Sequence, residues 1–397
     1  MFRRFQNLTF LSGILLIIIL ISIKIILDKY FQTKQDRIRI GIPIKTVEQR
    51  QALGQFFPDN REIANANYIE LTSGWREFFT LQQAGLEPQL VLEVNKQELI
   101  GNQFHTLKQI DSMLCNFQQR YDSILTIEQI GESAFNHLPI KAVKISDFPA
   151  QNEDEPTVLF TAAHHANEPL GIEICLYIID YLCNNYQQNQ KVRQWINKTE
   201  IWFVPVINPD GYQLVTNNKS IIIWRKNLRD NNSDGKFTPE MDGVDLNRNY
   251  AFNWGIEGDR FPSSNYYPGL FPFSEPETQA IRDLAKREHF SIHLDFHSAG
   301  EVILYPVGID SSGHDDEIIK FATGIARHIK KRGKFSHYTV APMNNRVGQC
   351  SLWMYNELGV FSFIVEAGDS YFPAKDEMNA IVQENAEAAF WILDKIS

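Results

Sequence analysis

Residues 157–182, which read TVLFTAAHHANEPLGIEICLYIIDYL, decide the fold class of this chain. Thr157–Phe160 opens the stretch with the β-branched and aromatic residues that are typical of a buried strand. Leu170–Leu182 follows as a largely apolar helical segment, and Ile201–Val206 is a second run of the buried-strand type. Strands that alternate with helices in this way predict an α/β fold, in which a mostly parallel mixed sheet is covered by helices.

The same alternation continues toward the C-terminus. Apolar and polar residues alternate strictly in Phe290–His297, which is the pattern of a strand. Ser274-Glu275-Pro276-Glu277 has the sequence of a capping box and predicts a helix that runs to about His289. The remaining predicted strands and helices are Val302–Val307, Asp315–Lys331, Val360–Val365 and Met378–Ile396. We therefore assign residues 104–397 to one large α/β domain.

The N-terminal residues have a different composition. Residues 10–27 are largely apolar and approach the about 20 residues that a membrane-spanning helix requires. No small-residue cleavage site follows them, so we predict a transmembrane anchor in preference to a cleaved signal peptide or a buried core helix. Arg3 and Arg4 favour a cytoplasmic location for residues 1–9, although four basic residues between 29 and 39 weigh against this orientation. The rest of the chain is then expected on the extracytoplasmic side.

Between the anchor and the large domain lie a polar linker, residues 28–37, and a small predicted domain at 38–103. In the small domain, Ile38–Ile44, Tyr68–Leu71 and Leu90–Val94 have the composition of strands, with helical segments between them. This βαβαβ order predicts a small α/β domain, in which we find no catalytic arrangement of residues.

Composition narrows the classes of partner. Lys and Arg number 38 against 48 Asp and Glu, which gives a formal net charge of −10. An acidic chain without a basic stripe is not expected to bind nucleic acid. The four cysteines form no CxxC motif and do not make a disulfide scaffold.

Three predicted strands end next to residues that can bind a metal ion. His165 and Glu168 follow the first strand, His297 ends the alternating strand, and Glu366 follows the last strand. Sites in such sheets form at the carboxyl ends of the strands. Two histidines and one glutamate around Zn²⁺, with the fourth position open, are a catalytic arrangement. A separate carboxylate can then accept the proton of the bound water.

Two further histidines compete for these positions. His164 competes with His165, but the spacing to Glu168 favours His165. His293 shares the strand face of His297 but lies about 13 Å earlier along the strand, so both cannot bind one ion. We interpret His293 as a core histidine or one that supports the site. The HxxE pattern by itself is weak, because residues at the start of a helix can have the same spacing.

Several short segments, which follow one another in a fixed order along the chain, are stronger evidence of function. They are Ile130-Gly131-Glu132-Ser133, Pro156–Gly171, Asn208-Pro209-Asp210-Gly211-Tyr212, Trp224-Arg225-Lys226-Asn227, Gly243-Val244-Asp245-Leu246-Asn247-Arg248-Asn249, Ser274–Glu277, His297 placed eight residues before Tyr305, and Phe363–Glu366. In this order they resemble the motifs of the metallocarboxypeptidases of the carboxypeptidase A and T family. The resemblance extends over residues 104–397.

The resemblance implies a zinc carboxypeptidase fold with one Zn²⁺ ion. His165, Glu168 and His297 match the metal ligands of the family. Asp245 matches a residue that orients the first histidine ligand, because a ligating histidine usually donates its other N–H to a carboxylate. Glu366 matches the general base, which deprotonates zinc-activated water and passes the proton to the leaving amine.

The same resemblance implies how a peptide is held. Arg225 matches the arginine that stabilises the oxyanion, since a fixed guanidinium offsets the negative charge of a tetrahedral intermediate. Asn247 and Arg248 match the pair that binds the terminal carboxylate of the substrate, which a planar guanidinium grips with two hydrogen bonds. This pair favours an exopeptidase that acts on peptides with a free C-terminus.

The chain departs from the family pattern at two positions of the substrate site. Asn167 stands where the pattern has an arginine, which we interpret as an altered substrate contact. No tyrosine lies between Tyr338 and Tyr355, and the position of the tyrosine in the family pattern falls near Asn344.

The specificity pocket is expected to draw on residues 344–353, which contain no Asp or Glu. This composition disfavours a strict preference for Lys or Arg at the substrate terminus. Arg346 is our candidate for binding an acidic side chain or the second carboxylate of a diamino acid.

A second metal ion has a weaker signal. Asp230-Asn231-Asn232-Ser233-Asp234-Gly235 resembles the first half of a calcium-binding loop. The twelfth position is Met241 and not glutamate, so a polar turn is favoured over a Ca²⁺ site.

These patterns together predict a membrane-anchored bacterial zinc metallocarboxypeptidase that hydrolyses C-terminal peptide bonds outside the cytoplasm, with a cell-wall peptide as its expected substrate. Two alternatives stay open. One is an endopeptidase or amidase of the same fold that cuts cell-wall stem peptides, and the other is an inactive peptide-binding receptor. Because it precedes a peptidase, the domain at 38–103 is interpreted as an inhibitory prosegment, a spacer or a recognition module.

Overall fold

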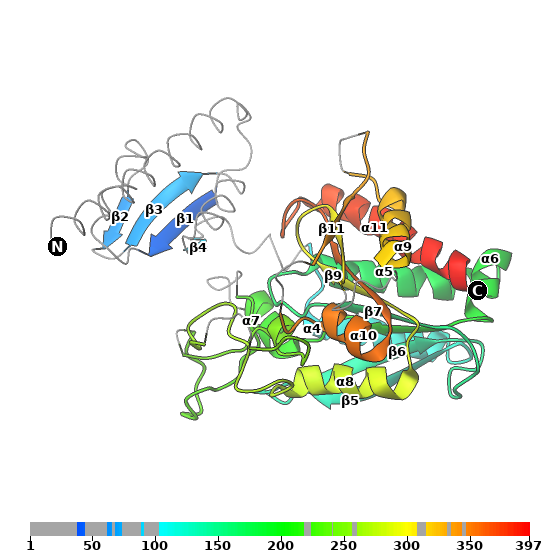
Figure 1. Cartoon of the computed structure of the whole chain (residues 1–397), viewed down its shortest axis with the longest axis horizontal. Coiled ribbons are helices and arrows are strands. Elements are labelled where there is room, and N and C mark those ends of the chain that lie inside the picture. The colour runs from blue at the N-terminus through cyan, green and yellow to red at the C-terminus, as the bar shows by residue number, and fades with distance from the viewer. Residues whose placement is uncertain are drawn as a thin grey trace. The chain divides into compact units, whose positions relative to one another are not determined.

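The computed structural model describes most of the C-terminal three quarters of the chain and the backbone of four strands before it. The continuous stretches are 103–217, 224–239, 241–255, 260–307, 315–331, 335–343 and 347–397. The predicted anchor at 10–27 and the linker at 28–37 lie outside the described residues. No helix in the described stretches is both long and apolar enough to cross a membrane. The chain divides into two compact units, Met1–Lys96 and Gln97–Ser397 (Figure 1).

The first unit contains a four-stranded antiparallel sheet in the order β2-β3-β1-β4. The strands are β1 (Ile38–Pro43), β2 (Glu62–Asn65), β3 (Tyr68–Ser73) and β4 (Gln89–Leu90). Three of them overlap predicted strands, whereas β2 has no counterpart among the predictions. The helical segments predicted between these strands lie outside the described residues.

The second unit is built around an eight-stranded mixed sheet in the order β11-β10-β12-β9-β7-β8-β6-β5. The strands are β5 (Leu125–Glu132), β6 (Pro139–Ile145), β7 (Thr157–Ala162), β8 (Glu200–Val204), β9 (Ile292–His297), β10 (Val302–Tyr305), β11 (Thr339–Pro342) and β12 (Phe361–Glu366). The four central strands, β12, β9, β7 and β8, are parallel. Antiparallel pairs join β8 to β6, β6 to β5 and β12 to β10. This sheet confirms the predicted α/β class.

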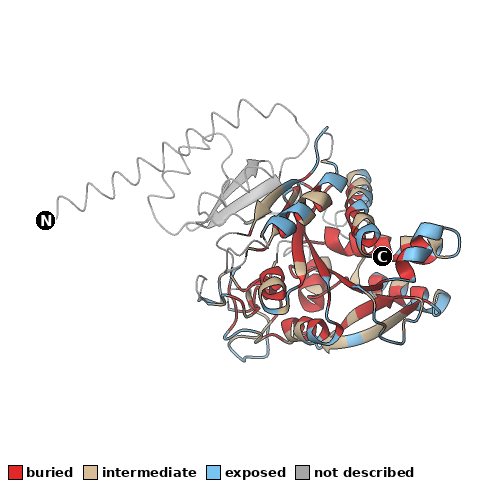
Figure 2. Cartoon of the chain, turned by 45° about the vertical axis from the view of Figure 1, so that its right-hand side comes forward, coloured by how far each residue is buried: buried red, intermediate tan, exposed pale blue. Residues whose placement is uncertain are grey.

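Helices cover both faces of this sheet. They are α4 (Leu107–Arg120), α5 (Leu170–Asn185), α6 (Gln190–Ile196), α7 (Pro209–Asn217), α8 (Pro276–Glu288), α9 (Asp315–His328), α10 (Cys350–Leu358) and α11 (Lys375–Ile396). α5, α9 and α11 pack together on one face, and α8 and α10 lie on the other (Figure 1). Every residue of β7, β8 and β9 is buried as a result (Figure 2), which is the pattern of parallel strands covered on both sides.

The start of α8 corrects one prediction. The helix begins at Pro276 after Glu275, and no side chain caps it. Ser274 Oγ donates to the Glu275 carboxylate at 2.8 Å, while Glu277 Oε1 accepts a 2.9 Å hydrogen bond from the Ala134 N–H. The predicted capping box is therefore wrong, because the Glu277 carboxylate is engaged by a distant segment and not by the helix N-terminus.

Strand register brings the ends of three central strands to one edge of the sheet. Ala162 at the end of β7 pairs with Phe296, and His297 at the end of β9 pairs with Glu366 at the end of β12. Residues that follow these strands therefore gather at a single place, which is where the sequence places its metal-binding candidates.

Candidate metal centre

Three candidate ligands converge at the carboxyl edge of the central strands. His165 and Glu168 follow β7, and His297 is the last residue of the adjacent strand β9. Glu168 Oε1 lies 2.9 Å from His165 Nδ1, and Glu168 Oε2 lies 2.8 Å from His297 Nδ1. The two Nδ1 atoms are 3.0 Å apart. All three side chains are buried, and one ligand atom from each lies within 4.8 Å of the others.

The far edge of each imidazole faces a carboxylate. His165 Nε2 lies 3.2 Å from Asp245 Oδ1, and His297 Nε2 lies 2.8 Å from Asp295 Oδ2. A ring that donates its Nε2 proton to a carboxylate keeps the lone pair of Nδ1 for a metal ion. Two such lone pairs and the Glu168 carboxylate then face one another, and a cation between them relieves the repulsion. Two imidazole nitrogens and one carboxylate fit the preferences of Zn²⁺.

Neighbouring charges keep the carboxylates of this group ionised. Burial alone would raise the pKa of Glu168, but His165 and His297 hold that pKa well below its usual range. Burial opposes ionisation of Asp295 as well, yet His164 and His297 keep its pKa well below the ordinary value. Burial lowers the pKa of His165, which favours the neutral ring. Burial acts in the same direction on His297, but Asp295 and Glu168 raise the pKa of that ring above its ordinary value. Ionised carboxylates and a neutral imidazole are the forms that bind a divalent cation.

Asp245 connects the first ligand to a guanidinium group. Its Oδ1 atom faces His165, and its Oδ2 atom accepts a 3.0 Å hydrogen bond from Arg225 Nε. Arg225 Nη1 lies 3.4 Å from Glu168 Oε1. Burial alone would lower the pKa of Arg225, but Asp245 and Glu168 raise it. A permanently charged guanidinium therefore lies beside the ligands, where it is suited to stabilise an anion.

The 3₁₀ turn η1 (Leu246–Arg248) brings Asn247 and Arg248 to the same group. Asp245 Oδ1 accepts a 2.9 Å hydrogen bond from the Asn247 N–H, which ties the turn to the first ligand. The Asn247 side chain is buried, with Oδ1 accepting from the Cys350 N–H at 2.9 Å and Nδ2 at 3.1 Å from His297 Nε2. Arg248 Nη1 donates to the Asn247 carbonyl at 2.6 Å. The Asn247 side chain therefore belongs to the core beside the candidate ligands, whereas Arg248 is half-buried.

Glu366 ends β12 and is the register partner of His297 on β9. Side chains in register on adjacent parallel strands point to the same face, so Glu366 is directed to the side of the sheet that carries the third ligand. The surroundings of Tyr371 agree with this placement: burial, Glu168 and Glu366 raise the pKa of Tyr371, and Arg225 opposes them. The Tyr371 hydroxyl is therefore close enough to Glu168, Glu366 and Arg225 for their charges to affect its pKa.

The two competing histidines have other partners. His164 lies 3.0 Å from Asp295 Oδ1 and 2.8 Å from the Tyr250 hydroxyl, so both of its ring nitrogens are engaged. His164, Asp295 and His297 are close enough together to hold an ion, but this group shares His297 with the cluster around Glu168. His293 is buried between the hydroxyls of Thr161 and Ser362, each at 2.7 Å. Burial lowers the pKa of His293 to about 4, as expected of a core histidine.

Residues 110–388 match the family model for zinc carboxypeptidase. The chain belongs to the zinc carboxypeptidase family. It is thereby a zinc-dependent peptide hydrolase, and the family implies one Zn²⁺ ion, for which His165, Glu168 and His297 are the candidate site.

Individual zinc carboxypeptidases show the extent of the likeness. Carboxypeptidase O of Bos taurus is 26% identical over 315 residues, which cover 74% of this chain and 79% of that protein. Carboxypeptidase B of Helicoverpa zea is 31% identical over 236 residues, which cover 58% of this chain and 52% of that protein. This match therefore spans about half the length of that relative.

Solved structures share the fold. Thrombin activatable fibrinolysis inhibitor superposes with a TM-score of 0.71 at 19% identity, over 91% of this chain and 98% of that chain. Carboxypeptidase A from Helicoverpa armigera gives a TM-score of 0.68 at 22% identity, over 89% and 95% of the two chains.

Asp295 is a partner of the zinc carboxypeptidase site that the sequence analysis missed. It holds His297 through Nε2 and also contacts His164. A signal was present, because Asp295 shares one strand face with His293 and His297 in the alternating stretch. The contact to His164 joins residues that are far apart in the chain, so spacing could not indicate it.

Two buried polar atoms beside the metal group have no hydrogen-bond partner within the described stretches. They are Asn167 Oδ1 and Ser298 Oγ. Asn167 directly precedes Glu168, and the Ser298 N–H donates to Glu168 Oε2 at 3.2 Å. Buried polar atoms are normally paired, so these two atoms are exceptions next to the candidate ligands. The other predicted substrate positions, Asn344 and Arg346, lie outside the described residues.

The calcium-like segment forms a turn in the structure. The Asp230 carboxylate accepts the backbone N–H groups of Asp234 and Gly235, and Asp234 Oδ1 accepts that of Lys236. These carboxylate oxygens serve the backbone, as in the polar turn that the sequence favours. Whether the loop also binds Ca²⁺ stays a prediction.

Proposed function

We propose that the unit Gln97–Ser397 is an exopeptidase that hydrolyses the last peptide bond of substrates with a free C-terminal carboxylate. The observation that carries this proposal is the convergence of His165, Glu168 and His297 beside two guanidinium groups, Arg225 and Arg248. Such a site provides for a metal ion, for a developing oxyanion and for a terminal carboxylate.

Each charged residue then has one task. Zn²⁺, when bound, acts as a Lewis acid that polarises the scissile carbonyl and lowers the pKa of water. Glu366 accepts the proton of the attacking water and delivers it to the leaving amine. Arg225 stabilises the negative charge that develops on the carbonyl oxygen. Asp245 and Asp295 hold the two histidines through their Nε2 atoms.

Recognition of the substrate is assigned to the other side of the site. Arg248 binds the terminal carboxylate, for which a guanidinium offers two parallel hydrogen bonds. Asn247 supports this contact from its buried position in the same turn.

The test compares two peptides that differ only in their C-terminus, one with a free carboxylate and one amidated. The zinc-loaded full chain should release the terminal residue of the first peptide and leave the second intact. Internal cleavage of both peptides would instead support the endopeptidase or amidase. If neither peptide is hydrolysed but the free-carboxyl peptide binds, the protein is the inactive receptor.

The location of the enzyme is a separate proposal. The apolar residues 10–27 anchor the chain in a bacterial membrane, with the catalytic unit outside the cytoplasm and close to cell-wall peptides. The apolar composition of this segment supports the proposal. In cell fractionation, the full chain should be in the membrane fraction and a variant lacking residues 1–37 should not. Recovery of both proteins in the same fraction contradicts the anchor.

Arg346 is proposed to select acidic side chains or a second carboxylate at the substrate terminus. The support is that residues 344–353 contain no Asp or Glu to oppose such a group. Arg346→Ala should lower kcat/KM for peptides that end in glutamate, with little effect on peptides that end in leucine. An unchanged profile removes this proposal.

The role of residues 38–103 is tested by removing residues 1–103. A rise in peptidase activity supports an inhibitory prosegment. If activity does not rise, inhibition is excluded, and a spacer or a recognition module remains.

A further inference from the structure

Tyr266 contacts both guanidinium groups of the proposed substrate site. The Cζ atom of Arg225 lies 5.4 Å from the centre of the Tyr266 ring, and that of Arg248 lies 5.6 Å from it. Both distances are within the about 6 Å range of a cation–π interaction. Half of the Tyr266 side chain is still exposed, so the ring joins the two arginines at a surface that a substrate can reach.

The chain from Pro262 to Pro268, which carries this ring, is hydrogen-bonded to residues next to both arginines. Lys226, the neighbour of Arg225, donates through Nζ to the Pro262 carbonyl. The Asp245 N–H donates to the carbonyl of the buried Tyr267 at 2.8 Å. Contacts of this kind precede and follow Tyr266, so its backbone is held relative to the metal ligands.

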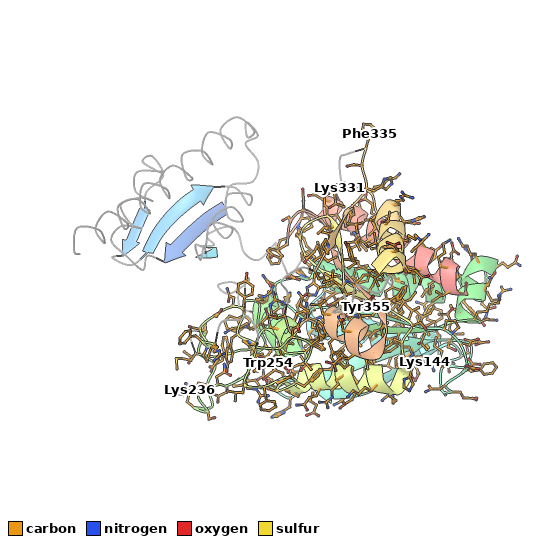
Figure 3. The ribbon with its side chains drawn as sticks, viewed as in Figure 1. Lys144, Lys236, Trp254, Lys331, Phe335 and Tyr355 are labelled. Atoms are coloured by element: carbon orange, nitrogen blue, oxygen red, sulfur yellow. The ribbon has the colours of Figure 1, made fainter. Side chains whose placement is uncertain are left out.

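The other end of the segment is held in the same way. Asn249, the neighbour of Arg248, donates through Nδ2 to the Pro268 carbonyl at 2.7 Å. Trp254 donates to the same carbonyl through Nε1 at 3.1 Å, and it lies among the loops beside α8 (Figure 3). With both ends anchored, the position of the Tyr266 ring is set by the fold.

An aromatic ring can hold arginines in a way that suits this site. Two guanidinium groups repel each other, and one edge of Arg225 is already taken by the Asp245 carboxylate, which accepts from Nε at 3.0 Å. The face of an aromatic ring attracts a cation through its quadrupole and accepts no N–H group at the edge of the guanidinium. The ring can therefore orient both arginines and leave their hydrogen-bonding edges directed elsewhere.

We propose that Tyr266 is a positioning residue that sets the placement of Arg225 and Arg248 relative to each other. The inference rests on the proposed function, in which Arg225 meets the oxyanion and Arg248 meets the terminal carboxylate. One ring then contacts both guanidinium groups and so limits how each can move relative to the other. Loss of the ring affects turnover through Arg225 and substrate binding through Arg248.

The test measures kcat and KM of the zinc-loaded full chain with a free-carboxyl peptide. Tyr266→Leu should lower kcat/KM by about 5- to 30-fold, the effect of two partly exposed cation–π contacts, through both a lower kcat and a higher KM. Tyr266→Phe keeps the ring and should stay within about twofold of the wild type, because the ring and not the hydroxyl provides the contact. Phe261→Leu, at an exposed aromatic residue of the same segment, should leave both constants unchanged.

Two results overturn the inference while the proposed function stands. In both cases the wild type releases C-terminal residues. In the first case Tyr266→Leu is fully active, and in the second case Tyr266→Leu and Tyr266→Phe lose the same fraction of kcat/KM. If the wild type hydrolyses nothing, the affinity for an N-acetylated amino acid with a free carboxylate, measured by calorimetry, takes the place of kinetics. Weaker binding to Tyr266→Leu than to Tyr266→Phe then supports the positioning role, and equal binding contradicts it.

Discussion

Glu366 lies directly opposite His297, in register on the adjacent parallel strands β12 and β9. Hydrogen bonds of the central sheet therefore set the placement of the proposed base against the third zinc ligand. The same sheet positions His165 and Glu168, which follow β7 on the other side of β9. A site built on strand ends in this way is more precisely held than one carried by long loops.

The first prediction concerns the proposed general base. Glu366→Gln keeps the size of the side chain but cannot accept a proton, so kcat should fall by about 100- to 10,000-fold. Zinc content, measured by atomic absorption, should stay near that of the wild type. Glu357→Gln, at an exposed glutamate of α10, is the matched control and should be fully active. Retained activity of Glu366→Gln would assign the proton transfer to another group.

The second prediction concerns the residue that the sequence analysis missed. Asp295→Asn weakens the partner of His297 Nε2, and Asp245→Asn does the same for His165. Each change should weaken zinc binding by about 10- to 100-fold, which is typical for partners of ligating histidines. Competition with a chromogenic chelator measures the dissociation constant. Unchanged affinity in Asp295→Asn would mean that His297 is oriented without this carboxylate.

The third prediction concerns Gly348, which follows the residues proposed for substrate selection. Its φ is +61°, and a Cβ atom there would lie 2.0 Å from the Arg248 carbonyl oxygen. Gly348→Ala should therefore displace the turn that carries Arg248 and raise KM. It should also destabilise the fold by more than the about 1–2 kcal/mol that a left-handed conformation costs a residue with a Cβ atom.

Gly359 provides the control for this steric effect. Its φ is +72°, and a Cβ atom there has no neighbour within 4 Å. Gly359→Ala should lower the free energy of unfolding only by the cost of the left-handed conformation, and it should leave KM unchanged. Equal unfolding free energies and equal KM values for the two variants, from denaturant titration and kinetics, would show that the Arg248 turn tolerates the extra atom.

The fourth prediction concerns the pH dependence of stability. His105 Nδ1 lies 2.7 Å from Glu173 Oε2, and the hydrogen bond that the ring donates to this carboxylate raises the pKa of His105 above its ordinary value of 6.5, against the effect of burial. A histidine whose pKa is raised by folding stabilises the protein fully below its unfolded pKa. This contribution is lost as the pH rises through the folded pKa.

His105→Gln removes the titrating group and tests this sign. The stability difference between wild type and variant, measured by thermal unfolding, should be larger at about pH 5.5 than at about pH 8.5. Because the His105 side chain is 39% exposed, solvent screening limits the effect to about 1 kcal/mol or less. A difference that does not change with pH would mean that folding leaves the pKa of His105 unshifted.

Sequence patterns predicted the centre of the second unit well and its edges poorly. β7, β8, β9 and β12 are runs of apolar residues because both of their faces are covered, and such runs stand out in a sequence. No strand was predicted for β5 or β6. β5 is the edge strand, and its mostly half-buried residues weaken the pattern, whereas most residues of β6 are buried. The capping box at Ser274 failed because Glu277 bonds to Ala134, and that contact depends on the tertiary fold.

The sequence by itself determined the α/β class, the family and the three candidate zinc ligands, because strand composition and motif spacing are properties of short stretches of chain. Only the tertiary structure decided that Asp295 holds His297 and contacts His164, and that Tyr266 joins Arg225 to Arg248. Most of these contacts join residues that are many positions apart. Their geometry depends on how the sheet and its loops pack, so no local pattern of residues encodes it.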